Sequence, residues 1–137
     1  YGNLTLESNT IIQNNVKIIC SGNITINNSQ IGTGLYSPVV IYSKGAADYN
    51  SSTVYGLIIS KGSSLDLDGS TVYGAIMNYG STFTLRGVTA ITGSVVSNYS
   101  MDIQGGNVII SKGSIPPFFN TDIGLNPMVI PGSYLEY

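Results

Sequence analysis

The chain has 137 residues, of which 5 are Lys or Arg and 7 are Asp or Glu, so its formal net charge at pH 7 is −2. Charged residues make up 9% of the sequence, against roughly 25% in an average soluble domain. Nucleic acid and anionic lipid require several Lys or Arg on one face, and no such cluster occurs, so both are excluded as partners.

The chain contains no His and a single cysteine, Cys20. This composition excludes Ser-His-Asp and Cys-His catalysis, the commonest zinc sites and an internal disulfide. We expect Cys20 to be a small buried hydrophobic residue. No apolar run approaches the 18 or so residues of a transmembrane helix, so no membrane segment is expected in this chain. No cofactor or metal is predicted.

A short unit, here called a rung, recurs from the N-terminal end onward and consists of alternating apolar residues separated by Gly, Ser and Asn corners. Residues 3–8 (NLTLES) match the second half of a rung, and residues 16–27 (VKIICSGNITIN) match a whole one. Residues 27–38 (NNSQIGTGLYSP) lengthen the spacing and are predicted to be a loop leaving the coil. IYSKGA at 41–46 returns to the pattern, and AADYNSS at 46–52 is predicted to be a turn between rungs.

The repeat is strongest in the middle of the chain. Residues 52–69 read STVYGLIISKGSSLDLDG, residues 70–87 read STVYGAIMNYGSTFTLRG, and residues 88–105 keep the pattern with a slip of one residue. A short fixed period with alternating apolar residues and no helical spacing indicates a β-solenoid, in which each rung closes the core of its neighbour. Gly56 and Gly74 fall between inward-facing neighbours, where we expect a side chain to crowd the interior.

The repeat weakens toward the C-terminal end. Residues 105–114 form a shortened last rung whose IISKGS repeats the hexapeptide at 58–63. Residues 115–137 hold four of the 5 prolines and are predicted to cap the open end of the coil. We therefore predict an all-β, single-domain, right-handed β-solenoid with rungs of about 18 residues over 1–114, a loop at 27–38 and a C-terminal cap.

The units GLIISKG and VYGAIMNYGS, the late IPPF and the closing IPGSYLEY resemble the C-terminal β-solenoid domains of PilX-like proteins of type IV pili and related surface appendages. Bactofilin filaments and secreted β-helices use similar rungs. The resemblance covers residues 16–137 loosely and 52–137 better. It implies a surface or pilus-associated role without catalytic residues. The family's hydrophobic N-terminal helix is not in this sequence, so we expect the chain to be the exposed domain of a longer protein.

One group of side chains suggests an enzymatic alternative. Polysaccharide lyases and hydrolases on β-helices place acids and an arginine on one outward face. The repeat puts the matching residues of successive rungs in two columns, and the simplest expectation for them is an exposed Asp68–Arg86 ion pair. The candidate residues of this alternative are Asp66, Asp68, Arg86 and Asp102.

Two further sets of residues point to an extracellular surface. Sequons for N-glycosylation occur at Asn3, Asn23, Asn27, Asn50 and Asn98, and Asn27 and Asn50 are favoured because they fall in predicted loops. The second set is an apolar outward stripe, which either binds a partner or is covered by the 27–50 segment or the C-terminal tail. The stripe consists of Tyr55, Leu57, Ile59, Tyr73, Met77 and Val96.

The sequence therefore predicts a non-enzymatic structural or adhesive module of an extracellular surface, pilus or filament. Its expected partners are other protein subunits, in a homo-assembly, with surface glycans as a further class of ligand. The alternative is a carbohydrate-active β-helix that acts through the Asp/Arg columns.

Overall fold

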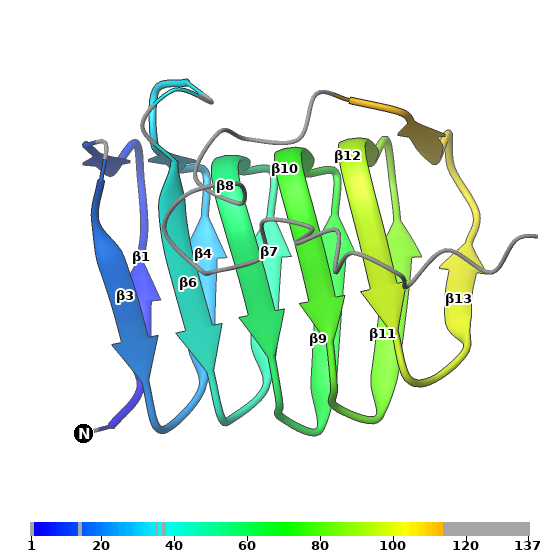
Figure 1. Cartoon of the computed structure of the whole chain (residues 1–137), viewed down its shortest axis with the longest axis horizontal. Coiled ribbons are helices and arrows are strands. Elements are labelled where there is room, and N and C mark those ends of the chain that lie inside the picture. The colour runs from blue at the N-terminus through cyan, green and yellow to red at the C-terminus, as the bar shows by residue number, and fades with distance from the viewer. Residues whose placement is uncertain (1, 14, 35, 37, 114–137) are drawn as a thin grey trace, which may run out of the picture.

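The structure is a computed structural model, and it describes residues 2–13, 15–34, 36 and 38–113. These residues form a β-solenoid of two parallel sheets that lie face to face, with successive turns of the chain stacked side by side (Figure 1). Within this part of the chain every regular element is a strand, and no helix is long and apolar enough to cross a membrane. The predicted all-β β-solenoid with rungs of about 18 residues is confirmed, and its right-handed sense stays a prediction.

The two sheets differ in their strands. The six-stranded sheet contains, in order, β1 (Leu4–Leu6), β4 (Ile24–Asn27), β7 (Ala47–Asn50), β9 (Ser64–Asp68), β11 (Thr82–Arg86) and β13 (Met101–Gln104). The eight-stranded sheet contains β2 (Ile11–Ile12), β3 (Lys17–Cys20), β5 (Gln30–Ile31), β6 (Val39–Ser43), β8 (Thr53–Ser60), β10 (Thr71–Asn78), β12 (Ala90–Ser97) and β14 (Ile109–Ser111). In its first turns β2 with β3, and β5 with β6, take the place of one long strand.

The core is made of apolar columns, because alternate residues of every strand point inward and strands pair in register. In the six-stranded sheet the inward-facing residues of the four strands between the two end strands are all fully buried. One column is Leu4, Ile24, Ala47, Leu65, Phe83 and Met101, and the other is Leu6, Ile26, Tyr49, Leu67, Leu85 and Ile103. Cys20 is also buried, as predicted.

Buried hydroxyl groups close one corner of each rung. The backbone N–H of Ser29 donates to Ser52 Oγ at 3.2 Å, and the N–H of Ser52 donates to Ser70 Oγ at 3.1 Å. Ser70 Oγ in turn donates to the carbonyl oxygen of Tyr49 at 2.9 Å. Each hydroxyl thus serves a neighbouring rung, which explains why Ser occurs where the chain leaves one sheet for the other.

Three details of the predicted organisation are wrong. Residues 46–52 are not a turn, because Ala47–Asn50 is the strand β7, paired with β4 and β9. The loop at 27–38 is shorter than predicted, because Asn27 ends β4 and Gln30–Ile31 is β5. The two IISKGS copies are also not equivalent: Ile58 pairs with Ile76, whereas Ile109 pairs with Ala90 in a different half of the sheet.

The glycines that recur at the same place in successive strands of the eight-stranded sheet have a different cause from the one predicted. Gly56, Gly74 and Gly93 lie in register on β8, β10 and β12. A Cβ at Gly74 would lie 2.0 Å from the carbonyl oxygen of Gly56. The close neighbour is therefore the backbone of the next strand rather than side chains of the interior. The predicted cap at 115–137 lies outside the described residues.

Candidate functional site

The outward face of the six-stranded sheet carries the acidic and basic residues of the enzymatic alternative. The strand register confirms the two predicted columns. Thr84 separates Asp66 from Asp102, so these carboxylates are two strand spacings apart, roughly 9.6 Å. The columns are Asp66, Thr84 and Asp102, and beside them Asp68, Arg86 and Gln104.

Arg86 pairs with a different carboxylate from the one predicted. Its guanidinium Nη2 donates to Asp66 Oδ1 at 2.9 Å, a diagonal contact across β9 and β11. The side chain of Asp68 leans toward the following corner, where a Cβ on Gly87 would lie 2.6 Å from Asp68 Oδ1. A long side chain reaches its diagonal neighbour in a sheet, so the register alone does not fix the ion pair.

Asp48 is a fourth acid on this face, which the sequence analysis did not identify. It lies on β7, directly opposite Asp66 on β9. The pKa of Asp48 is raised first by burial and then by the charge of Asp66 and a hydrogen bond with it, while Arg86 acts in the opposite direction. A carboxyl group with a raised pKa therefore lies beside the carboxylate that pairs with Arg86.

The sequons occupy positions that differ from those predicted. Asn27 and Asn50 lie at the ends of strands rather than in loops, and Asn50 Nδ2 donates to Asn27 Oδ1 at 2.8 Å. Asn3 Oδ1 accepts the backbone N–H of Asn23 at 2.9 Å. Asn98 is exposed at the corner after β12. The geometry therefore favours Asn98, because the nitrogen that would carry a glycan on Asn50 is already engaged.

The outward face of the eight-stranded sheet carries a large apolar area, bordered by polar residues such as Lys17 and Ser94. We call it the outer apolar face and define it by three columns that the register aligns. They are Ile19, Tyr42, Ile59, Met77 and Val96; Val40, Leu57 and Ala75; and Tyr55 and Tyr73. All six residues of the predicted stripe belong to it.

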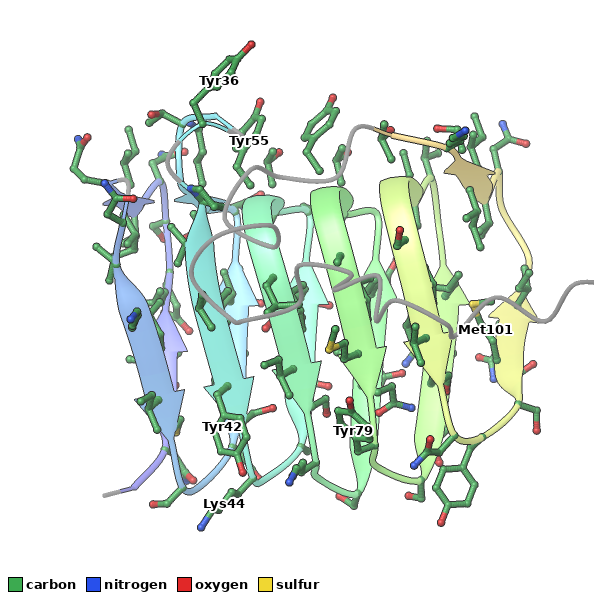
Figure 2. The ribbon with its side chains drawn as sticks, in the orientation of Figure 1. Tyr36, Tyr42, Lys44, Tyr55, Tyr79 and Met101 are labelled. Atoms are coloured by element: carbon green, nitrogen blue, oxygen red, sulfur yellow. The ribbon has the colours of Figure 1, made fainter. Side chains whose placement is uncertain are left out.

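The centre of this face is buried and its margins are exposed to solvent. Leu57 and Ala75 keep only 3% and 5% of their surface exposed, and they pack with Val40, Ile59 and Met77 in a cluster separate from the main core. Val96 is 53% exposed. The rings of Tyr55 and Tyr73 stack with centroids 4.8 Å apart. Figure 2 places Tyr42 near the lower ends of the strands and Tyr55 near the upper ends.

The prediction that residues 27–50 fold over this face is wrong, because most of them form strands of the two sheets. Val40 and Tyr42 of β6 are themselves members of the face. Tyr36, in the segment between β5 and β6, is 94% exposed and points away from the sheet (Figure 2). The other predicted cover, the C-terminal tail, lies outside the described residues.

Sequence reasoning missed Ile19, Val40 and Tyr42 because the break before β6 hid the register. A signal was present, since IYSKGA at 41–46 aligned on IISKGS at 58–63 places Tyr42 beside Ile59.

Groups of three or more His, Cys, Asp or Glu that could hold a metal ion do not occur in the part of the chain that the structure describes. No protein-family model matches the sequence, and no curated protein or solved structure is significantly similar to it. The chain is thus characterised by its architecture, a β-solenoid with one polar and one apolar outward face.

Proposed function

We propose that this chain is a non-enzymatic structural or adhesive module of an extracellular surface, pilus or filament, and that its outer apolar face binds another protein subunit. The observation that carries the proposal is the contrast between the two outward faces. One holds Asp48, Asp66 and Arg86 with Thr and Asn. The other holds ten apolar or aromatic residues in aligned columns.

Apolar patches that reach the surface mark interaction sites, and this face reaches it at Ile19 and Val96, which are 77% and 53% exposed. Tyrosine and methionine are enriched in protein interfaces, and Tyr42, Met77 and the stacked Tyr55–Tyr73 pair lie on this face. The tyrosine side chains bury a large area with few rotatable bonds, so a partner gains contact with them at a modest entropic cost.

The location of the module is proposed on different grounds. The low charge content and the hydroxyl- and amide-rich surface are typical of exported proteins, and Asn98 offers an exposed sequon. The resemblance of the repeat units to PilX-like pilus-associated domains favours the same location.

Hydroxyl-radical footprinting at low and high protein concentration tests the interface. Assembly through the outer apolar face should lower the oxidation of Tyr42 and Met77 as concentration rises. Met77→Glu should abolish this protection, whereas Thr25→Glu on the polar face should retain it. Unchanged oxidation of Tyr42 and Met77 at every concentration, in the chain alone and with its candidate subunits, would contradict the proposed interface.

A second candidate function rests on Asp48 and Asp66. Their strands are adjacent, roughly 4.8 Å apart, and a hydrogen bond joins their carboxyl groups. Glycosidases use a pair of Asp or Glu carboxyl groups as acid and as nucleophile or base. Under this alternative, Asp48 is the acid and Asp66 the nucleophile. Neutral and acidic polysaccharides incubated with wild type and with Asp66→Asn decide it: cleavage that the variant loses would establish an enzyme and overturn the structural proposal.

A further inference from the structure

Among the residues from 2 to 113 that the structure describes, the core of the solenoid is open at both ends. In the inward column that runs from Leu6 to Ile103, the four intervening residues are fully buried, but Ile103 is 55% exposed. In the eight-stranded sheet the column Ile12, Ile31, Val54, Val72, Ile91 and Ile110 behaves in the same way, and Ile110 is 45% exposed. The last described rung therefore presents core residues without the neighbouring rung that buries them elsewhere.

The first rung presents the complementary surface. Leu4, Leu6, Ile12 and Ile18 pack against the core from one side and remain half-buried. They line a hollow of about 420 Å³ at this end of the coil, together with Cys20 and its neighbours. Figure 1 shows that this end and the end at β13 are opposite ends of the stack.

The strand edges at both ends are also unpaired within the described chain. β1 and β13 are the end strands of the six-stranded sheet, and β2 and β14 are end strands of the eight-stranded sheet. The N–H of Leu4 donates to Asn23 O at 2.8 Å. Since successive residues of a parallel strand bond to opposite neighbours, the N–H of Thr5 faces the open side. Such edges accept further strands.

We propose that copies of this chain stack end to end, with β13 of one copy pairing in parallel with β1 of the next, and β14 with β2. In this pairing the inward residues of one copy stack on the inward residues of the next, because Met101 lies against Leu4 and Ile103 lies against Leu6. On the outward side it sets Asp102 opposite Thr5, so no like charges meet. The inference deepens the proposed function by naming the partner as a second copy, but it uses the ends rather than the outer apolar face.

The contact joins two different surfaces, so it is heterologous. A heterologous contact that does not close into a ring produces a filament. In a straight stack of parallel rungs the same step repeats along one axis, and each added copy leaves a fresh end for the next. The structure thus assigns the chain a way to grow in length while both sheet faces remain available for other contacts.

The first test blocks each end separately and measures mass by sedimentation over a range of concentrations. Ile103→Glu places a charge in the last rung, and Thr5→Pro removes the N–H that a stacked strand would need. Wild type should grow in mass with concentration, and each variant alone should remain a monomer. Their mixture should form a heterodimer, because each retains the end that the other lacks. Val88→Glu, an exposed corner position, should behave as wild type.

The other outcomes overturn the proposal. Wild type that stays monomeric shows that the ends do not stack. Growth that appears only after deletion of residues 115–137 shows that the chain's own tail occupies the end. Blocked variants that still grow show assembly through another surface, such as the outer apolar face, which footprinting at Met77 then reveals separately from Met101.

A second measurement does not depend on the blocked variants folding. In a Cys20→Ser background, Thr5→Cys and Asp102→Cys introduce thiols at exposed outward positions. A short bismaleimide should cross-link the mixture of the two variants into dimers and should cross-link neither variant alone. Cross-linking of one variant by itself, or none in the mixture, contradicts the head-to-tail register.

Discussion

Replacing Gly74 with alanine is the sharpest test of how the rungs are held together. Gly74 has a φ of +141° and lies between Gly56 and Gly93 on adjacent strands. A Cβ there would be 2.0 Å from Gly56 O, 1.4 Å short of the 3.4 Å at which ordinary contact begins. Alanine adds only this one carbon atom, so the loss of stability combines the cost of a side chain at this φ with the close contact to the Gly56 backbone.

The expected loss of stability follows from two contributions. A non-glycine residue held at this φ costs about 1–3 kcal/mol. Parallel strands lie about 4.8 Å apart, and moving one outward weakens about two ladder hydrogen bonds, each worth about 0.5–1.5 kcal/mol. We therefore expect Gly74→Ala to lower the free energy of unfolding by about 2–6 kcal/mol, a large part of the roughly 5–15 kcal/mol of a typical domain.

Urea unfolding followed by circular dichroism measures this difference, with Gly105→Ala as the matched control. Gly105 also has a positive φ, +69°, but a Cβ there meets no atom within 4 Å. Its substitution should lower stability by only about 1–2 kcal/mol. Equal losses in the two variants would refute the reasoning, because they would mean that conformation rather than the close approach of Gly56 decides the cost.

Three further predictions use single side chains. Burial raises the pKa of the Tyr49 phenol, so the unfolded chain loses this proton first and stability should fall as pH rises past about 10; Tyr49→Phe should reduce this fall in melting temperatures measured at pH 8 and 11. The raised pKa of Asp48 contributes stability below about pH 3.8 that is lost as pH rises through the folded-state value. Asp48→Asn should therefore increase the free energy of unfolding by a few tenths of a kcal/mol at pH 7 and leave it unchanged at pH 3, as measured by urea unfolding, with Asp68→Asn on the same face as the control. Ser60 Oγ is buried and has no partner in the described chain, so Ser60→Ala should be neutral or stabilising, whereas Ser70→Ala should cost about 1–2 kcal/mol in the same assay because it breaks the corner hydrogen bonds.

The sequence predicted the solenoid because its repeat records the core directly. In residues 52–105 each rung needs apolar residues at the same places, and the strands that result pair in the register read from the repeat. The slip of one residue is also real: Val72 pairs with Ile91, while Phe83 keeps the shorter step to Met101. The extra residue lies in the corner between β11 and β12.

The errors arose where side chains, not spacing, carry the information. Residues 46–52 contain Asp, Asn and two Ser, which are typical of turns, yet stacking against Ile26 and Leu67 draws Tyr49 into the core. Asp48 was lost from the candidate site for that reason. The Arg86–Asp66 ion pair was missed because a register gives the neighbours of a residue, whereas the lean of its side chain selects among them.

The alternation of side chains along a strand also explains why the core does not account for the outer apolar face. Inward and outward residues alternate, so the core dictates only every second residue of a strand. The six-stranded sheet uses this freedom for Thr25, Asp48 and Asp66 on its outward side, which shows that polar columns are compatible with the stacking. The eight-stranded sheet instead carries a column from Ile19 to Val96 through five consecutive rungs. Nothing in the core requires this column, and exposed apolar surface favours aggregation, so its persistence is best explained by a surface that is covered when the protein works.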